Sequence, residues 1–344
     1  MRAKKYFAAS NTESGFVSYF AQNFRLRADR SYIIKGGPGT GKSRLMREMG
    51  AAFENVGGDV EYYYCSSDPS SLDGLFVNVN GDKIAVMDGT APHSEDIVSA
   101  GVVDNIIDLG RFWDARILRQ RRYEIDAWGA QKKRAYASAY RALASYGSAR
   151  RAADALAESC IDKGAIAEEC AKIAVNLKKE EPLPSPTAAV GMKGYVAFDS
   201  FRESAGLTLC ISDNRGYGLS YLYFDALIRA IGSCRVSPHH ILNGRYSGLV
   251  SGGVAVVEAN LTDMGEKVID ISEFVDRSIW LTIKERAERL RQAADVMLDE
   301  AMDSFKEAGT AHMKIEEIFA EAMDFAEKEA YSEFLCSKIA AGEL

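Results

Sequence analysis

The octapeptide Gly36-Gly37-Pro38-Gly39-Thr40-Gly41-Lys42-Ser43 constrains the fold more than any other segment of the chain. It fits the pattern G-x-x-x-x-G-K-[S/T] at every fixed position. A β-rich stretch from Ser31 to Ile34 precedes it, and an amphipathic helical pattern from Ser43 to about Phe53 follows it. This order of strand, glycine-rich turn and helix predicts an α/β unit with a largely parallel sheet.

The residue types in this turn suit a polyphosphate. Glycines allow positive φ angles and close approach of the backbone, so successive N–H groups can converge on phosphate oxygens. Lys42 can reach the β- and γ-phosphates, and Ser43 can offer its hydroxyl to Mg²⁺. The helix that begins here adds its positive dipole end. We therefore expect the octapeptide, with Arg44 directly after it, to bind a nucleoside triphosphate and Mg²⁺.

A carboxylate for the Mg²⁺ site is expected at Asp88. It ends the apolar run Ile84 to Met87, and folds of this kind hold the magnesium water shell at the end of such a strand. Ser43 and Asp88 are accordingly the predicted metal residues. Lys42 and Asp88 are predicted to act in catalysis.

The group that activates the nucleophile is less sharply indicated. Asp68, in the sequence CSSDP after the second predicted strand, is taken as the base, and Asp73 is the alternative. Either aspartate can equally be a turn or helix-cap residue. Gly89 follows Asp88 where many ATPases have a glutamate. His93 can contact phosphate, although a helix cap is the favoured interpretation.

The second half of the chain repeats the order of the first, which predicts a duplication. Gly41 falls opposite Gly218, Ser43 opposite Ser220, and Asp88 opposite Glu258. The matched segments are Lys4 to Ala8 with Lys193 to Ala197, Ile33 to Leu45 with Cys210 to Leu222, Cys65 and Pro69 with Cys234 and Pro238, Lys83 to Gly89 with Gly253 to Ala259, Ile106 to Asp114 with Val268 to Asp276, and Leu143 and Gly147 with Phe305 and Gly309.

The second copy of the glycine-rich loop lacks the features that hold a polyanion. In Asp213 to Ser220, Leu219 replaces the lysine, and Asp213 puts a carboxylate where phosphate would lie. Both changes oppose triphosphate binding. The sequence therefore predicts one working site, in the first half.

A proline-rich stretch divides the chain. Residues 178–187 read KKEEPLPSPT, which precludes a regular helix or a central strand and predicts a linker. We expect a P-loop NTPase domain with a helical extension over residues 1–180. A degenerate repeat with C-terminal helices is expected over residues 190–344.

Further elements follow from apolar periodicity. Strands are expected at Val60 to Cys65, Lys83 to Asp88 and Asn105 to Leu109, and helices from about Asp114 to Leu177. A helix capped by Ser10 or Thr12 is expected to carry Phe16, Tyr19, Phe20 and Phe24 on one face.

Two helical regions have expected roles as well as positions. The basic stretch Arg116 to Arg134 can be a lid over the γ-phosphate, a surface for an acidic partner, or a solvated helix face, which is favoured. The helical tail from Ile283 to the C-terminus is expected to pack on its own half rather than to form an independent coiled coil.

Composition limits the environment and the partners. Hydrophobic residues make up 47% and charged residues 26%, as in soluble globular proteins, and the net charge is −7. An acidic balance disfavours nucleic acid as a partner. No signal peptide or membrane span is indicated, and the six cysteines form no metal or disulfide framework, so free thiols in the cytoplasm are expected.

The chain resembles a family of poorly characterised bacterial ATP-binding proteins built from two P-loop-like halves and variously described as ATPases or nucleotide-kinase-like proteins. The segments that carry the resemblance are FAASNTESGFVSYF, YIIKGGPGTGKSRLM, VEYYYCSSDPSSLDG, AVMDGTAPH and IIDLGRFWD. It implies a tandem P-loop architecture and ATP binding at Gly36 to Ser43 and Asp88. The second loop, DNRGYGLS, departs from what the resemblance implies.

These observations predict a Mg²⁺-dependent ATPase or phosphoryl-transfer enzyme with ATP and Mg²⁺ as ligands. ATP is favoured over GTP because no N/TKxD-type guanine signature is present. The alternatives are an ATP-responsive regulatory module with little or no turnover and a small-molecule kinase. A protein partner or a homo-oligomer is compatible with the sequence.

Overall fold

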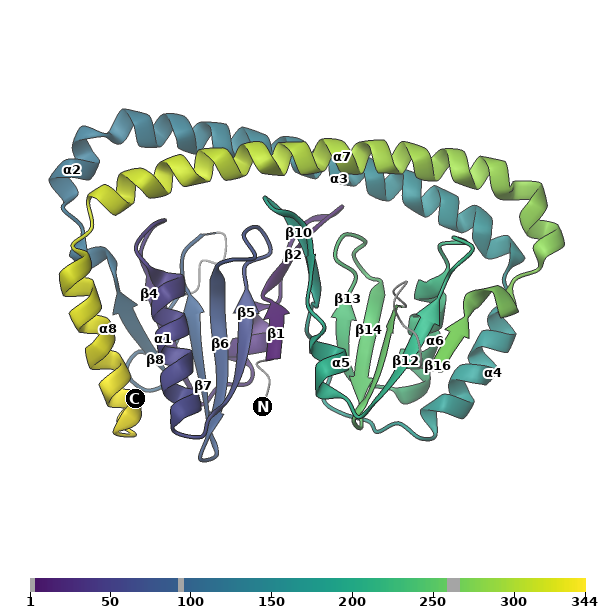
Figure 1. Cartoon of the computed structure of the whole chain (residues 1–344), viewed down its shortest axis with the longest axis horizontal. Helices are drawn as coiled ribbons and strands as arrows, with labels where there is room; N and C mark the ends of the chain where they lie inside the picture. Colours follow the sequence, from purple (N-terminus) through teal and green to yellow (C-terminus); the bar gives the residue numbers. More distant parts are fainter. Residues whose placement is uncertain (1–3, 92–95, 259–266) are drawn as a thin grey trace.

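The computed structural model describes residues 4–91, 96–258 and 267–344 and shows a mixed α/β protein made of two similar halves (Figure 1). Each half contains one six-stranded sheet with helices packed against it. Two long helices run above both sheets and connect the halves.

The sheet of the first half combines parallel and antiparallel pairs. Its strand order is β1 (Lys4–Phe7), β5 (Asp59–Tyr64), β6 (Leu72–Val79), β7 (Asp82–Asp88), β4 (Arg30–Lys35) and β8 (Asp104–Asp108). β1 is parallel to β5, and β7, β4 and β8 are parallel to one another. β6 is antiparallel to both of its neighbours. β4, β5, β7 and β8 agree with the sequence expectation, but β1 and β6 were not predicted as strands.

The sheet of the second half repeats this arrangement strand for strand. Its order is β9 (Leu183–Pro184), β13 (Arg235–Pro238), β14 (Tyr246–Ser251), β15 (Val254–Glu258), β12 (Leu207–Ser212) and β16 (Lys267–Asp270). β14 is again the antiparallel strand, and all other neighbours are parallel. Matching order and directions confirm that the chain consists of two similar halves.

Strand register tests the individual matches between the halves. Ile34 is level with Asp88, and Ile211 is level with Glu258, so the alignment of the two loops and of Asp88 with Glu258 is confirmed. The match of Cys65 with Cys234 is wrong. A β-bulge between Tyr63 and Tyr64 corresponds to one between Ser237 and Pro238. Tyr64 is therefore equivalent to Pro238, and Cys65 is equivalent to the residue after Pro238.

The match of Lys4 to Ala8 with Lys193 to Ala197 is also wrong. Residues 194–197 form β11 (Gly194–Ala197), which pairs with β10 (Ala188–Gly191) in a hairpin. Its counterpart is the hairpin of β2 (Ala9–Thr12) and β3 (Gly15–Ser18). This hairpin and the short π-helix η1 (Ala21–Arg25) replace the single helix expected over this region.

The stretch predicted as a linker contains a strand. β9 pairs with β13 at the edge of the second sheet, and the Phe7 N–H donates to the Pro186 carbonyl at 2.8 Å. Prolines are tolerated there because an edge strand has one unpaired side. Residues 178–187 therefore belong to the second sheet and to the contact between the halves, so the prediction of a simple linker is wrong.

Helices cover the outer face of each sheet. The helices are α1 (Lys42–Asn55), α2 (Ala115–Gln120), α3 (Arg122–Ala157), α4 (Lys163–Ala174), α5 (Ser200–Ser204), α6 (Ser220–Ile231), α7 (Arg277–Glu321) and α8 (Phe325–Ala340), with 3-10 turns η2 (Gly110–Phe112), η3 (Glu158–Cys160) and η4 (Ile271–Phe274). Alternation along β4 separates two cores, because Ile34 packs with α1 while Ile33 faces the second half.

The helix that follows each long helix, α4 after α3 and α8 after α7, packs on the sheet of the other half. α4 packs on α6 in the second half, whereas α8 packs on α1 in the first, where Leu335 and Ile339 join the core. The connections are equivalent: the Asp114 N–H donates to the Ala322 carbonyl at 2.8 Å, and the Asp276 N–H donates to the Cys160 carbonyl at 2.7 Å. The expectation that the C-terminal helices pack on their own half is therefore wrong for α8.

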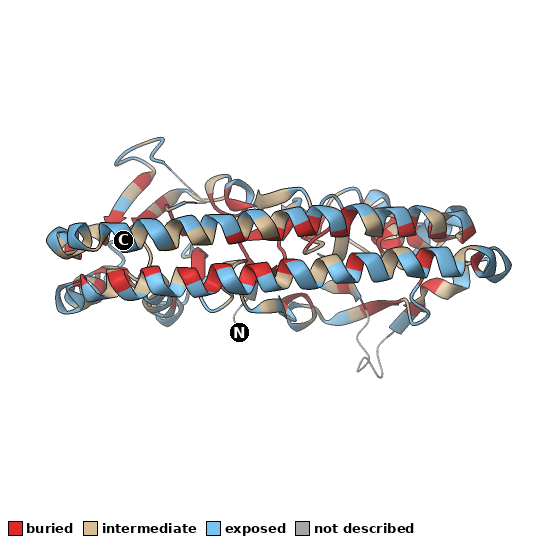
Figure 2. Ribbon diagram, turned by 90° about the horizontal axis from the view of Figure 1, so that it is seen from above, coloured by how far each residue is buried: buried red, intermediate tan, exposed pale blue. Residues whose placement is uncertain are grey.

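The two long helices α3 and α7 form an antiparallel pair that roofs both sheets (Figures 1 and 2). Isolated bridges join Trp113 to Met323 at one end of the pair and Ile161 to Val275 at the other. Alanines at heptad spacing (Ala287, Ala294, Ala301, Ala308) are buried along α7. Small residues at this spacing let the helices approach closely, as in an antiparallel coiled coil.

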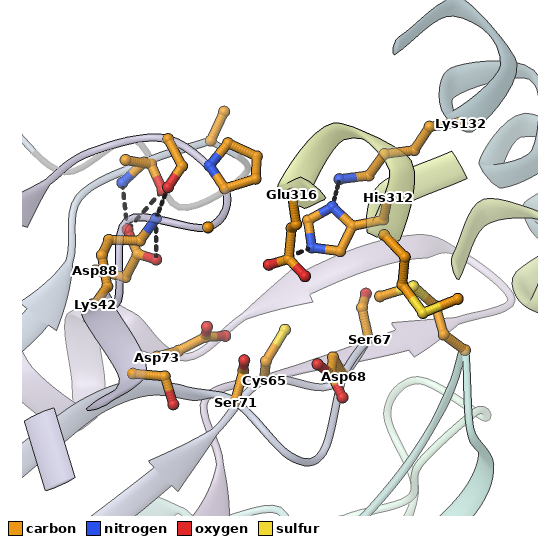
Figure 3. Close-up of a pocket in the computed structure, with 18 of the residues that line it drawn as sticks. Lys42, Cys65, Ser67, Asp68, Ser71, Asp73, Asp88, Lys132, His312 and Glu316 are labelled. Carbon is orange, nitrogen blue, oxygen red and sulfur yellow. Dashed lines mark hydrogen bonds and ion pairs between the residues drawn. The ribbon is translucent and has the colours of Figure 1, made fainter. Parts of the chain in front are cut away.

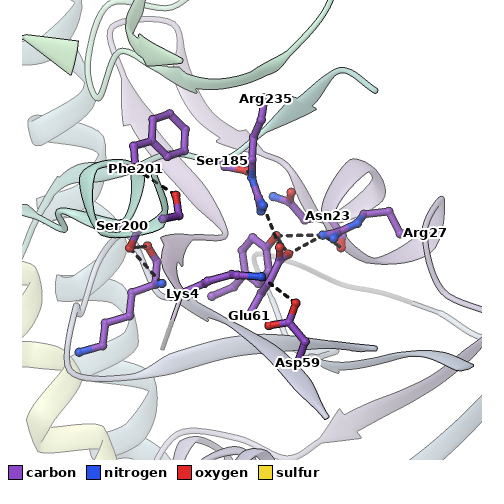
Figure 4. Close-up of polar contacts among 12 residues, drawn as sticks. Lys4, Asn23, Arg27, Asp59, Glu61, Ser185, Ser200, Phe201 and Arg235 are labelled. Atoms are coloured by element: carbon purple, nitrogen blue, oxygen red, sulfur yellow. Dashed lines mark hydrogen bonds and ion pairs between the residues drawn. The ribbon is translucent and has the colours of Figure 1, made fainter. Parts of the chain in front are cut away.

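A buried ionic cluster joins the sheets where β5 faces β13 (Figure 4). The Glu61 carboxylate accepts hydrogen bonds from Arg27 and Arg235, each at 2.8 Å. Burial acts to raise the pKa of Glu61, but the charges of Arg235 and Arg27 outweigh it and lower the pKa to about 2. Glu61 is therefore ionised at neutral pH and ties the two halves together.

Within the described residues, no helix is both long and apolar enough to cross a membrane. All six cysteines have free thiols.

Candidate functional site

The glycine-rich loop connects the carboxyl end of β4 to the amino end of α1. Gly39 and Gly41 adopt φ angles of 71° and 80°, which favour glycine, and Gly41 is the N-cap of α1. A Cβ atom on Gly39 would lie 2.7 Å from the backbone oxygen of Glu316 in α7. The loop thus needs glycine both for its turn and for its close contact with the helical roof.

Lys42 is held over this loop beside Asp88. Its ammonium donates to the carbonyl oxygens of Gly36 and Gly37 at 2.8 Å each, and Nζ lies 3.5 Å from Asp88 Oδ2. Thr90 donates both its N–H and its hydroxyl to Asp88 Oδ1. Burial raises the pKa of Asp88, whereas the charge of Lys42 acts to lower it. β4 and β7 are adjacent parallel strands, and this adjacency places the two predicted catalytic residues together (Figure 3).

Ser43 and Asp73 complete this side of the site. Ser43 Oγ accepts from the Leu72 N–H at 2.9 Å and from Arg47 at 2.8 Å, so both of its lone pairs are engaged. Its own proton can be donated to a ligand, and Mg²⁺ would bind this oxygen in place of one of the two donors. Asp73 follows Leu72 on β6, is buried, and interacts electrostatically with Asp88. Ser43 and Asp88 carry oxygen atoms of the kind Mg²⁺ prefers, and Asp73 is a second carboxylate that interacts with Asp88.

Among the described residues, no three His, Cys, Asp or Glu side chains gather closely enough to hold a metal by themselves. Mg²⁺ is commonly bound by one or two carboxylates together with substrate phosphates and water, so Ser43 and Asp88 fit that role and a protein cage is not required.

Asp68 lines the same cavity but is held by other groups. Its Oδ1 accepts from the N–H and hydroxyl of Ser70, and it lies 3.0 Å from Lys193 Nζ of the β10–β11 turn. Burial acts to raise its pKa, but the hydrogen bonds from Ser70 and Lys193 lower it. A carboxylate stabilised in this way is a weaker proton acceptor than a buried, less paired one.

A cavity of about 1330 Å³ begins at the loop and extends beneath the roof. Gly37 to Ser43, Asp88, Asp68 and Asp73 form one side of it. The opposite wall comes from α3 and α7, and the hairpins of both halves contribute Phe16 and Met192. Most of the residues predicted from the loop motif therefore lie in one cavity.

The roof brings a cation, an imidazole and a carboxylate to this cavity. Lys132 Nζ of α3 lies 2.9 Å from His312 Nδ1 of α7, and His312 Nε2 lies 3.5 Å from Glu316 Oε1. Burial and, less strongly, Lys132 lower the pKa of His312 to about 4, so the imidazole is neutral near pH 7 and Nδ1 accepts from Lys132. Burial also lowers the pKa of Lys132 and raises that of Glu316.

Some predicted residues lie elsewhere. Arg44 points away from the cavity and pairs with Glu48 and with Glu329 of α8. In the basic stretch Arg116 to Arg134, three arginines pair with neighbouring carboxylates at the surface: Arg116, Arg121 and Arg122. The cationic residues of this stretch that line the cavity are Lys132 and Lys133. His93 lies outside the described residues.

The second loop is filled by its own side chain. Asp213 accepts the N–H of Tyr217 at 2.8 Å and that of Gly218, so its carboxylate occupies the turn where the first half exposes backbone amides. Arg291 of α7 donates to the carbonyls of Gly216 and Tyr217. At the position equivalent to Asp88, Glu258 accepts from the Ser220 hydroxyl at 2.8 Å.

The repeat extends to the roof of each loop. One interval along the chain relates Leu143 to Phe305 and Gly147 to Gly309. The same interval relates Arg150 to His312 and Asp154 to Glu316. A Cβ atom on Gly218 would lie 2.9 Å from Arg150 Nη2 and 3.0 Å from Asp154 Oδ1, and one on Gly39 would lie 2.7 Å from the backbone oxygen of Glu316. Each loop therefore contacts its long helix at an equivalent position, although through different glycines of the loop. His312 and Glu316 thus occupy in the first half the places that an Arg–Asp ion pair occupies in the second.

No family model, no curated protein and no solved structure matches this chain. The geometry of the cavity is therefore what indicates its chemistry.

Lys132, Tyr136, His312 and Glu316 were not predicted as site residues. They carry no local motif and come from helices far from the loop in sequence. One signal was present, because Glu316 and His312 align with charged residues of α3 at the interval that relates Gly147 to Gly309.

Proposed function

We propose that this protein has the P-loop NTPase fold and binds Mg²⁺–ATP at the Gly36–Ser43 loop, where it hydrolyses ATP or transfers the γ-phosphoryl group. The observation that carries the proposal is the 3.5 Å separation of Lys42, at the start of α1, from Asp88, at the end of β7. The loop that precedes Lys42 has positive φ at Gly39 and Gly41. A loop of this sequence at the amino end of a helix is suited to phosphate.

The chain's residues divide the work of phosphoryl transfer. The loop amides and Lys42 would bind the phosphates and stabilise charge on the transferring group. Ser43 and Asp88 would orient the magnesium and its water ligands. The nucleophile's proton would pass to a carboxylate of the cavity. We assign this role to Asp73, because it is buried and interacts with Asp88, whereas Asp68 pairs with Lys193.

The proposal places one nucleotide on each chain. In the second half, Leu219 supplies no ammonium, and Asp213 engages the amides of Tyr217 and Gly218. A triphosphate would have to displace that carboxylate and approach Glu258 without a neighbouring lysine.

Calorimetric titration of ATP with Mg²⁺, with phosphate release followed in parallel, tests the proposal. Wild type is expected to bind about one ATP per chain, and Lys42→Ala is expected to lose binding. Lys306→Ala on the exposed face of α7 is the matched control and should bind as wild type does. Absence of binding by wild type would overturn the proposal, and two ATP molecules per chain would overturn the single-site part.

The release rate separates an enzyme from a nucleotide-responsive module. Binding with turnover below about 0.001 s⁻¹, the scale of an unassisted GTPase, would identify the module. Gly89 after Asp88 is the feature that favours this second function, since it leaves the strand end without a second carboxylate.

A further inference from the structure

The cavity extends well beyond the glycine-rich loop. Its volume of about 1330 Å³ exceeds the usual range for a pocket that holds one small ligand, about 300–1,000 Å³. Figure 3 shows Lys42 and Asp88 at one side of the cavity and Lys132 at the other, with Glu316 and His312 between them. The end near Lys132 therefore offers space that the phosphates on the loop do not need.

Lys132 gives this end a positive charge, which the carboxylate of Glu316 offsets only at a distance greater than that of an ion pair. Its ammonium is partly buried, and its hydrogen bond goes to the neutral His312 rather than to a carboxylate. Among the described residues it forms no ion pair. A lysine carries three N–H donors, so donors remain that can face an anion in the cavity. Keeping such a cation half-buried is costly unless a ligand compensates it.

The surrounding walls suit a flat or apolar molecular body. Tyr136 and Tyr140 lie along one face of α3 with ring centroids 6.2 Å apart and planes inclined by 27°. Met192 and Phe16 face the same cavity. Aromatic rings and a thioether pack well against a planar ligand.

These walls are fixed by contacts between the halves. The Tyr140 hydroxyl donates to Asn11 Oδ1 at 2.8 Å, and the Asn11 amide donates to the Val190 carbonyl at 2.8 Å. The Met192 N–H donates to the Ser67 carbonyl at 2.9 Å. The end of the cavity is thus preorganised, as a binding site requires.

We propose that this end, formed by Lys132, Tyr136, Tyr140 and Met192, is a second ligand site that binds the phosphoryl acceptor, a small molecule with a ring-sized apolar body and an anionic group. The anion is a carboxylate or a phosphate, and Lys132 is its partner. The assignment of this ligand as acceptor rests on the proposed function, whereas the binding of a ring-bearing anion does not.

The transfer step balances without a further reactant. An acceptor hydroxyl or phosphate oxygen forms a bond to the γ-phosphorus as the bond from that phosphorus to the β–γ bridging oxygen breaks. ADP leaves with the electron pair of the broken bond. Where the acceptor is a hydroxyl, its proton passes to a cavity carboxylate, for which Asp73 is the candidate.

Binding is tested with anilinonaphthalene sulfonate, an aromatic anion whose fluorescence rises in apolar surroundings. The probe is titrated into the full chain alone and with a non-hydrolysable ATP analogue and Mg²⁺. We expect binding in both conditions, weakened by about tenfold or more in Lys132→Met, since a charge-assisted hydrogen bond is lost. Lys306→Met on the exposed side of α7 is the control and should bind normally.

Two results would overturn the second site: equal affinity in Lys132→Met and wild type, or loss of the probe when the analogue fills the loop. Circular dichroism and the thermal midpoint of each variant exclude unfolding as the source of a change. Competition by benzoate and by phenyl phosphate, which carry the same ring, tells which anion the site prefers.

The acceptor role is tested with ATP radiolabelled at the γ-phosphate and a small-molecule extract. A labelled organic product that wild type forms and Lys132→Met does not would support it. Release of inorganic phosphate alone, at equal rates in both proteins, would overturn it. Failure of the analogue to bind would instead contradict the proposed function, and the probe titration without nucleotide would still judge the second site.

Discussion

Asp68 and Asp73 have the same side chain but different surroundings. Asp68 accepts two hydrogen bonds from Ser70 and pairs with Lys193, and these contacts lower its pKa. Asp73 is buried on β6, shares a hydrogen bond with Cys65 and interacts with Asp88. The environment, rather than the residue type, therefore distinguishes the two candidate bases.

Asp73→Asn is expected to lower the turnover of ATP by about a hundredfold or more, the usual contribution of a general base. The dissociation constant for Mg²⁺–ATP should stay close to that of wild type, because Asn preserves the shape. Asp68→Asn should change turnover by less than about tenfold. Steady-state phosphate release and calorimetry measure the two quantities. A larger loss of turnover in Asp68→Asn than in Asp73→Asn would contradict this assignment.

Glu61 makes stability depend on pH. Its pKa is about 2 in the folded chain and near 4.5 when it is exposed. A lowered carboxyl pKa stabilises the fold at pH values above 4.5, and this contribution is lost as the pH falls from 4.5 toward 2. Glu61→Gln should therefore lower the free energy of unfolding by about 3 kcal/mol at pH 7, because two buried arginines lose their partner.

Urea denaturation at a series of pH values measures this effect. The difference in stability between wild type and Glu61→Gln should shrink as the pH is lowered through that window. Glu307→Gln, at an exposed position of α7, is the control and should track wild type. A difference that stays constant with pH would show that Glu61 does not act through its charge.

At the level of residues, the sequence predicted what the local motif contains. Lys42 and Asp88 were predicted and lie together, because adjacent parallel strands bring their carboxyl ends to one edge. Lys132 and His312 were missed, because a contact between two helices separated by most of the second half leaves no local pattern.

At the level of elements, the roof depends on small side chains between α3 and α7. Ala301 is fully buried near the middle of the pair, beside Phe305 and Leu143. A larger side chain there has no space without a shift of one helix.

Ala301→Leu is therefore expected to destabilise the chain by about 1–3 kcal/mol. Ala137→Leu, at an exposed position of α3, is the matched control and should have little effect. Thermal unfolding followed by circular dichroism provides the comparison. Equal unfolding midpoints for wild type and Ala301→Leu would show that the helices are not closely packed.

Periodicity located most elements but not their partners. It identified the strands beside the loop and the helices after Asp114, because their apolar spacing is regular. It missed β6, where burial continues from Leu72 through Val77 and the alternation of a half-exposed strand is lost. The edge strand β9 was missed because proline is rare in strands away from an edge.

At the level of the whole molecule, the duplication makes each half depend on the other. The roof of the first loop includes α7 from the second half of the chain, and Gly39 touches Glu316 directly. α8 supplies Leu335 and Ile339 to the core beneath α1, and α4 supplies Ile166 and Cys170 to the core of the second sheet. The sequence showed the repeat, but spacing along a chain cannot show which copy a terminal helix joins.

This exchange predicts that a fragment of residues 1–180 cannot work alone, although it contains the entire loop motif. It would expose the surfaces that α7 and α8 cover, and α4 would have no sheet to pack on. We expect the fragment to aggregate or to unfold without a cooperative transition, and to bind no ATP. Co-expression with residues 181–344 should restore a soluble complex that binds ATP, since the buried contacts between the halves do not need the covalent connection at residue 180. Gel filtration and calorimetry of the separate and co-expressed fragments measure both outcomes. Cooperative folding and ATP binding by residues 1–180 alone would mean that the first sheet and its loop are independent of the roof, and that the contact between Gly39 and Glu316 has no part in shaping the site.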